Sequence, residues 1–389
     1  MQIISQLLAS ILLSAGISAF LVPVIVRTVR KLKLLDQPNI RSSNVRPIPT
    51  LGGLAIYFGF LFATVVCSFG FEVPELIYII TASTLMLFIG LKDDLVTLSP
   101  VKKIVGQVIA ASILIFLAKI RFTNLHGLFG FAEIGLFPSV LITGFVIVLL
   151  INAINLMDGI DGLAAGLIML AASLFGSWFY ISGHIGHAII SFSLVGALIG
   201  FFYYNVYGKA NKIFMGDTGS LFIGTVISAI LIIFNELNID QSRPFAVESV
   251  PAISFGILAY PLIDTIRVMA IRMLQHKSPF SADKNHLHHR LLTLGFSHRS
   301  ATYTIIVLNI LFVIAVFALH HLGVLRLMAY ISISGGILFM IPAYFIHKRK
   351  LIHNNDPVQQ LLLPGSTEEI FRNRRHNLKK RKLRNTVDL

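Results

Sequence analysis

The sequence contains little of what stabilises a secreted or a soluble domain. It has one cysteine, Cys67, among 389 residues, and this cysteine lies inside an apolar run, so no disulfide framework is expected. Charged residues make up only 13% of the chain, whereas an ordinary soluble domain carries about 25%. Hydrophobic residues make up 55% of the chain and the mean hydropathy is +0.80. The composition therefore predicts an all-α integral membrane protein.

Other missing features exclude some classes of function. No short apolar run ends in a small-residue cleavage site, so the first apolar segment is expected to remain as an anchor. The sequence has no internal repeat at a fixed period and no inverted pair of broken helices, which argues against a transporter. The formal net charge is +14, but half of it lies in residues 347–389, which hold eleven Lys/Arg against four Asp/Glu. Such a tail favours anionic lipid headgroups over nucleic acid.

Apolar runs of membrane-spanning length recur along the chain. Eleven are expected, near residues 3–26, 51–69, 74–90, 103–119, 136–154, 160–181, 186–204, 217–235, 250–273, 302–320 and 324–346. Lys and Arg gather in alternate connections, namely 27–50, 91–102, 205–216 and 274–301, and in the tail. The positive-inside rule then places the N-terminus outside and the C-terminus in the cytoplasm. We expect a polytopic membrane domain over residues 1–346 and a basic cytoplasmic tail over residues 347–389.

The polar residues sort by side in this topology. Each connection that is rich in carboxylates or histidines falls on the cytoplasmic side, whereas the outer connections are short, neutral or acidic. One outer connection, residues 122–138, has glycines among aromatics and predicts a small hairpin. We therefore expect chemistry at the cytoplasmic face of the membrane.

The stretch 148–166 is the most informative part of the chain. It begins as an apolar run and becomes polar at Asn152, Asn155, Asp158 and Asp161, which are spaced by three, so any helical part would carry them on one face. Carboxylates at the edge of the hydrocarbon are costly and mark a functional site by default. The alternative is a polar turn with Asp as a helix cap, although a turn needs one or two polar residues rather than four aligned ones.

Two adjacent carboxylates, Asp93 and Asp94, stand in the second cytoplasmic connection. They repel each other unless a cation is near, although a solvated loop could also carry them. Ser99 and Pro100 then predict a helix start. Lys103 would lie in its first turn, where the helix dipole disfavours a cation, so a bound phosphate would relieve the conflict.

Two further connections hold candidate ligands. Asp217 lies between Gly216 and Gly219 where the chain re-enters the membrane, which suits a magnesium ion. Asp217 could instead cap the next helix, and both roles could hold together. Arg41 and Arg46 in the first cytoplasmic connection either hold phosphate or are ordinary positive-inside charges.

A histidine-rich run precedes the last two spans. His286, His288 and His289 are followed by Arg290. Their spacing is too close for structural zinc, and imidazoles beside Arg suit a diphosphate better. Just before this run, Asp264 and Arg267 are one helical turn apart and are expected to pair.

Six segments in order resemble one known family over roughly residues 30–300. They are Asp36-x-Pro-Asn, Pro49-x-x-Gly-Gly53, Asp93-Asp94, Asn152 to Gly162, Phe214-Met-Gly-Asp-Thr-Gly-Ser220 and His286-Leu-His-His-Arg-Leu-Leu292. The chain resembles the polyprenyl-phosphate N-acetylhexosamine-1-phosphate transferases, multi-pass enzymes of the bacterial cytoplasmic membrane. The resemblance implies transfer of a sugar 1-phosphate from a UDP-sugar to undecaprenyl phosphate, with release of UMP. It also implies a need for Mg²⁺, with Mn²⁺ as an alternative, and a homodimer is a further open alternative.

The resemblance assigns roles to the candidate residues. It makes Asp217 the magnesium ligand and places catalytic carboxylates at Asp93, Asp94, Asp158 and Asp161. The residues expected to bind substrate are Arg46, Lys103, Asn152, Asn155, Asn205, His286, His288, His289 and Arg290. Many members have Arg-Lys-x-His in the first loop, where this chain has Arg41-Ser-Ser-Asn44, so no role of that Lys or His transfers here.

The context of the histidine run favours one branch. Residues 282–292 are similar to the branch that starts O-antigen, enterobacterial common antigen or teichoic acid chains, in which GlcNAc is the commonest sugar. The alternative branch is the phospho-MurNAc-pentapeptide translocase of peptidoglycan synthesis. Among other classes, a CDP-alcohol phosphotransferase would need an Ala-Arg element after Asp158, which is absent, and the Phe-Met-Gly-Asp segment does not match a GxGD protease. A nucleotide-sugar transporter is the non-enzyme alternative.

Overall fold

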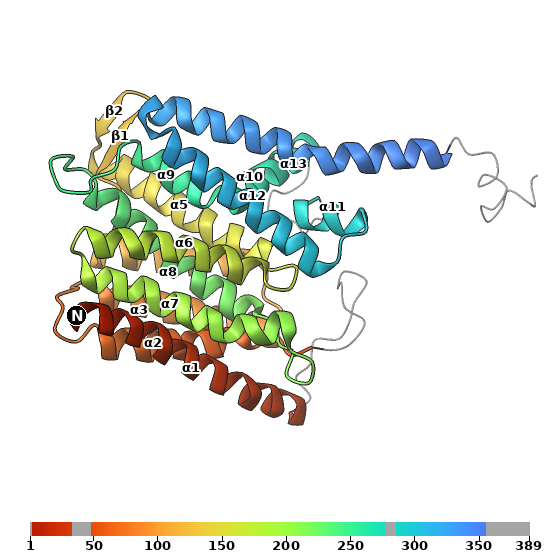
Figure 1. Ribbon diagram of the computed structural model, residues 1–389, viewed down its shortest axis with the longest axis horizontal. Coiled ribbons are helices and arrows are strands. Elements are labelled where there is room, and N and C mark those ends of the chain that lie inside the picture. Colours follow the sequence, from red (N-terminus) through yellow and green to blue (C-terminus); the bar gives the residue numbers. More distant parts are fainter. Residues whose placement is uncertain (1, 33–47, 277–284, 355–389) are drawn as a thin grey trace, which may run out of the picture. The chain divides into compact units, whose positions relative to one another are not determined.

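A computed structural model of the chain describes residues 2–32, 48–276 and 285–354 (Figure 1). These residues fall into two compact units, which divide after residue 338. The regular elements of the described residues are helices and one hairpin. The helices are α1 (Gln2–Lys31), α2 (Gly52–Cys67), α3 (Leu76–Leu95), α4 (Pro100–Ser112), α5 (Leu136–Met157), α6 (Leu163–Ile181), α7 (Ile185–Phe202), α8 (Gly216–Leu237), α9 (Val250–Ile257), α10 (Ala259–Leu274), α11 (Leu287–Thr293), α12 (His298–Ala318) and α13 (Val324–Asn354). Short π-helical or 3-10 turns follow three of them, at Ile113–Leu117, Tyr203–Tyr207 and His320–Leu322.

The membrane prediction is confirmed in its coarse form. Nine helices within the described ranges are long and apolar enough to cross a membrane, or ten if one bent pair counts as a span. Each of the eleven predicted segments contains a helix, but the segment 51–69 forms α2, which has only 16 residues, where a perpendicular span needs about 20. The chain is a multi-pass membrane protein, whereas the count of eleven and the orientation stay predictions.

The bent pair comes from one segment that was predicted as a single span. The run 250–273 forms α9 and α10, which meet at an angle of 83°. Pro261 explains the break, because a proline has no N–H to donate to the carbonyl four residues earlier and its ring clashes with that carbonyl. The carbonyl concerned belongs to Ile257, where α9 ends. The proline then lies in the first turn of α10, where it is tolerated.

Two other local predictions can be checked. The hairpin is confirmed, because β1 (Asn124–Leu128) pairs antiparallel with β2 (Phe131–Glu133). The start of α4 at Pro100 is also confirmed, although the Ser99 side chain makes no capping hydrogen bond. The boundary between a membrane domain and a basic tail at residue 346 falls within α13 and stays a prediction, since residues 355–389 lie outside the described ranges.

Helix α8 is the centre of the larger unit, because nearly all of its residues are buried. Glycines bring its neighbours close: a Cβ on Gly224 would meet the Ile151 backbone of α5, and one on Gly53 of α2 would collide with Gly219. By contrast, α1 exposes Leu12 and Phe20, as expected for side chains that face lipid. Helix α8 packs mainly against α3, α5 and α2.

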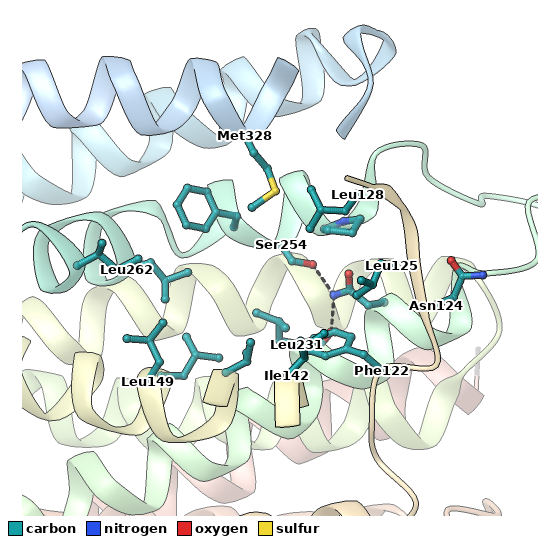
Figure 2. A pocket seen from close by; sticks show the side chains of 16 residues that line it. Phe122, Asn124, Leu125, Leu128, Ile142, Leu149, Leu231, Ser254, Leu262 and Met328 are labelled. Atoms are coloured by element: carbon teal, nitrogen blue, oxygen red, sulfur yellow. Dashed lines mark hydrogen bonds between the residues drawn. The ribbon is translucent and has the colours of Figure 1, made fainter. Parts of the chain in front are cut away.

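An apolar pocket of about 180 Å³ lies near the other end of α8. Its lining comes from the hairpin and from α5, α8, α9, α10 and α13, and includes Leu125, Leu149, Leu231, Leu262 and Met328 (Figure 2). Within it, Asn235 donates to Ser254 Oγ and to the Leu231 carbonyl, both at 2.8 Å. Leu231 stands a rise of about 21 Å along α8 from the first turn of that helix. The pocket is therefore separate from the polar cluster described next.

Candidate active site

Two segments that are far apart in sequence pair just before α2 and α8 begin. Phe214 N–H donates to the Pro49 carbonyl at 2.8 Å, and the Gly52 and Gly53 N–H groups donate to the Phe214 and Met215 carbonyls at 2.9 Å. A Cβ on Gly52 would collide with the Phe214 carbonyl, and one on Gly53 would collide with Gly219 of α8. The pairing places the Pro49–Gly53 segment directly beside the start of α8, so two of the six family-like segments meet here.

Asp94, at the end of α3, caps α8. Its carboxylate accepts the Asp217 N–H at 3.0 Å, the Thr218 N–H at 2.9 Å and the Thr218 hydroxyl at 2.6 Å. Gly216 fits this junction because its φ is +70° and a Cβ there would strike Asp94 and the Thr50 carbonyl. The alternative in which Asp217 itself caps α8 is therefore wrong, since the orphan N–H groups are taken by Asp94.

The Asp217 carboxylate instead lies in a charged cluster between helices. Lys103 Nζ is 2.5 Å from Asp217 Oδ2 and 2.5 Å from Asp93 Oδ2. Asn155 Nδ2 donates to Asp217 Oδ1 at 2.8 Å and to Ser220 Oγ at 2.9 Å. Lys103 lies in the first turn of α4, and here two carboxylates offset the unfavourable helix dipole. Four predicted site residues, from α3, α4, α5 and α8, are thus in direct contact.

The polar quartet divides at the end of α5. Asn152 lies on α5 and pairs with the buried Gln107 of α4: Asn152 Nδ2 donates to Gln107 Oε1 at 2.7 Å, and Gln107 Nε2 donates back at 3.3 Å. Asn155 is one turn further along. Because α5 ends at Met157, Asp158 and Asp161 lie in the following turn rather than on the helix face.

The environment of Asp158, including the neighbouring carboxylates, shifts its pKa. Loss of hydration, together with the negative charges of Asp217 and Asp94, raises the pKa of its carboxyl group well above the usual range, although a backbone hydrogen bond from Gly216 opposes the shift. Asp158 is therefore part of the same electrostatic cluster as Asp217.

Asp161 has different partners. Its Oδ2 lies 2.5 Å from Lys212 Nζ and 3.7 Å from His298 Nδ1. The turn that carries it ends at Gly162, which has φ +77° and donates its N–H to Asn205 Oδ1 at 2.6 Å. Asn205 Nδ2 in turn donates to the Ile213 carbonyl at 2.9 Å. The predicted ligand Asn205 thus braces this turn in the structure.

The histidine run is folded against the same turn. His288 is almost fully buried, and its ring lies against Gly159, where a Cβ would come within 2.6 Å of Nε2. Its Nδ1 is 3.2 Å from the Tyr260 hydroxyl. Burial and the nearby His289 lower the pKa of His288 to about 3, so the ring is neutral at ordinary pH.

The start of α11 is held by α10. His286 Nδ1 lies 2.8 Å from Asp264 Oδ2, and Arg267 donates to Asp264 Oδ1 at 2.6 Å, which confirms the predicted Asp264–Arg267 pair. His289 and Arg290 are half-buried on α11. The structure therefore places the histidine run beside the 158–162 turn, and its role in binding a diphosphate stays a prediction.

The carboxylate cluster can be tested against the magnesium ion that the resemblance implies. Within residues 2–32, 48–276 and 285–354, no three His, Cys, Asp or Glu side chains form a ready-made metal cage. Magnesium, however, is usually held by one or two carboxylates, with waters and substrate phosphates completing its shell. Asp93 and Asp217 contact the ammonium group of Lys103, while Asp94 binds the backbone N–H of Asp217 and Asp158 interacts electrostatically with Asp217. These four carboxylates therefore supply more oxygen donors than Lys103 occupies. The donor set therefore fits a hard cation.

Some contacts of the site were not predicted, and some predictions cannot be placed. Gln107 and Lys212 were missed; Gln107 had a signal, since it is four residues after Lys103 and so shares its helix face, whereas Lys212 had none. Arg41 and Arg46 lie in residues 33–47, outside the described ranges, as do residues 277–284 before the histidine run.

Comparison with known proteins identifies the family of the chain. Residues 76–235 match the model of Glycosyl transferase family 4. The chain is 30% identical over 278 residues to the undecaprenyl-phosphate alpha-N-acetylglucosaminyl 1-phosphate transferase of Escherichia coli (strain K12), covering 71% of this chain and 73% of that protein. It is 33% identical over 299 residues to the probable undecaprenyl-phosphate N-acetylglucosaminyl 1-phosphate transferase of Bacillus subtilis (strain 168), covering 76% and 80%. The chain therefore belongs to the polyprenyl-phosphate N-acetylhexosamine-1-phosphate transferase family.

Proposed function

We propose that this protein transfers N-acetylglucosamine 1-phosphate from UDP-GlcNAc to undecaprenyl phosphate and releases UMP. The reaction would be the first membrane step of a cell-envelope polysaccharide. The observation that carries the proposal is the cluster in which Lys103 bridges Asp93 and Asp217 beside Asp94 and Asp158. The names of the bacterial relatives support the acceptor and the sugar.

The reaction needs positioning and charge neutralisation more than covalent chemistry by the protein. An oxygen of undecaprenyl phosphate attacks the phosphorus that carries the sugar, and the bond from that phosphorus to the UMP oxygen breaks. We favour direct attack over a covalent aspartyl intermediate, with Asp93 or Asp94 as general base if the acceptor phosphate carries a proton.

Lys103, together with a metal held by the carboxylates, would neutralise the negative charge of the reactants. Magnesium bound at Asp217, with manganese as an alternative, would supply Lewis-acid neutralisation of the diphosphate. Lys103, which neutralises Asp93 and Asp217 in the structure, would then turn to the phosphate oxygens. Asn155 keeps Asp217 in place through its amide.

The site is proposed to face the cytoplasm of a bacterial inner membrane. UDP-sugars are made in the cytoplasm, and the positive-inside rule puts the start of α8 on that side. The acceptor's lipid chain would remain in the bilayer while its phosphate reaches the helix ends.

One experiment tests the reaction and its alternatives together. Purified protein in lipid nanodiscs is incubated with magnesium, undecaprenyl phosphate and a panel of labelled UDP-sugars that includes UDP-MurNAc-pentapeptide. We expect labelled lipid and UMP in equal amounts, with UDP-GlcNAc the best donor. Turnover of the pentapeptide donor alone would assign the translocase reaction instead. Uptake of an intact nucleotide sugar into sealed vesicles, without UMP, would indicate a transporter.

A further inference from the structure

A second ion pair, separate from the Lys103 cluster, holds the 158–162 turn. Lys212 Nζ lies 2.5 Å from Asp161 Oδ2, and the two side chains are 24% and 9% exposed. The Thr302 hydroxyl of α12 donates to the Asp161 carbonyl at 2.8 Å, and His298 lies 3.7 Å from the carboxylate. Asp161 is thus fixed on both its backbone and its side chain.

The segment that supplies Lys212 also binds the end of the turn through hydrogen bonds of Asn205. Asn205 bridges the Gly162 N–H and the Ile213 carbonyl, and Ile213 directly follows Lys212. The 205–213 segment therefore contacts the turn twice, through an amide bracket and through an ion pair. Of these two contacts, only the ion pair carries charge.

Asp161 depends on Lys212 for its charge balance. Its side chain is largely enclosed, and its Oδ1 is buried without a hydrogen-bond partner among the described residues. When one partner of an enclosed ion pair is removed, the remaining charge is left uncompensated, and the structure rearranges to hydrate it. His298 is further from the carboxylate than Lys212 is, so it replaces the lysine poorly.

The position of this turn matters because Asp158 stands at its other end. Asp158 is three residues before Asp161 and interacts with Asp217 and Asp94. A displacement of the turn would change the distance between Asp158 and these carboxylates. The geometry points to Lys212 as a positioning residue: its ion pair with Asp161 fixes the turn and so sets Asp158 against the start of α8. This inference rests on the proposed transferase function and goes beyond it, since it gives Asp161 a positioning role.

A double-mutant cycle tests the inference. The variants are Lys212→Met, Asp161→Asn, the double variant and Lys212→Arg, with Lys209→Met as the matched control because Lys209 is an exposed lysine of the same segment. UMP release is measured per amount of folded protein, taken from size-exclusion peaks, and thermal stability is recorded for each variant. We expect each single variant to lose at least about tenfold in turnover. The double variant should recover at least about fivefold over the worse single variant, because it leaves no unpaired charge. Lys212→Arg and Lys209→Met should stay within about threefold of the wild type.

Each outcome decides the question. A double variant that is no more active than the worse single variant overturns the inference and makes Asp161 a group that acts on substrate directly. Single variants with wild-type turnover also overturn it. If the single variants do not fold, a double variant that folds and turns over supports it, whereas a double variant that also fails to fold overturns it. Absence of transfer by the wild type and by Lys209→Met would instead count against the proposed function.

Discussion

Replacing Asp217 by Asn separates the loss of its charge from the loss of local structure. The cap of α8 comes from Asp94, which binds the backbone N–H groups of Asp217 and Thr218. These donors do not depend on the side chain at position 217. An Asn side chain also keeps an oxygen for the Asn155 amide, which now donates to Oδ1 at 2.8 Å. The variant should therefore fold and insert like the wild type.

The expected losses of stability and of turnover follow from the groups that the Asp217 carboxylate contacts. Lys103 remains paired with Asp93 at 2.5 Å, and both members of the broken Lys103–Asp217 pair are 24% exposed. The stability loss should therefore be about 1 kcal/mol. Catalysis should suffer more, because removal of a group that neutralises charge in the transition state costs roughly a hundredfold or more, equivalent to about 2.7 kcal/mol. A large loss of turnover together with a small loss of folding stability is the result expected if Asp217 holds the metal.

The assay is magnesium-dependent UMP release by purified protein, with thermal unfolding recorded on the same sample. Asp240→Asn is the matched control, since Asp240 also pairs with a cation, Arg243, at 3.2 Å, but in an exposed loop. The control should retain wild-type turnover. If folded Asp217→Asn also turns over near the wild-type rate, the reasoning is refuted, and the metal must be held elsewhere, at Asp93 or Asp94.

Three other predictions address the junction, the buried histidine and the topology. Gly216→Ala should lower both thermal stability and UMP release, because it adds a Cβ at φ +70° against Asp94; wild-type values for both would contradict the assigned geometry. His288 has a pKa near 3, so the unfolded chain binds more protons below about pH 6.5 and stability should fall as pH drops from there. His288→Gln should flatten that dependence in denaturant unfolding, and an unchanged slope would contradict it. Reporter fusions after residues 100 and 285 should be active in the cytoplasm and those after 72 and 240 should not; the reverse pattern would invert the topology.

The helices could largely be predicted because hydropathy over about 20 residues reports the solvent that each segment meets. Prediction from hydropathy gives the wrong helix boundaries where a local feature interrupts a continuous apolar run. Pro261 was visible in the sequence, yet hydropathy alone merged α9 and α10 into one span. The polar quartet shows the same limit, since a spacing of three places Asp158 on the face of Asn155 only if the helix continues, and α5 ends at Met157.

The members of the site could be predicted better than their roles. Asp94, Lys103, Asn155 and Asp217 were all candidates, because charged and amide side chains at membrane boundaries are costly without a function. Local rules compare a residue with its neighbours in the chain, however, and by that test Asp217 was a fair helix cap. The structure fills that role from α3, through hydrogen bonds from the Asp217 and Thr218 backbone to a residue more than a hundred positions earlier. Once Asp94 takes the backbone donors, the Asp217 carboxylate is left for Lys103 and Asn155. A cap supplied from another helix thus leaves the Asp217 carboxylate free of the capping role, and no spacing rule along the chain could show this.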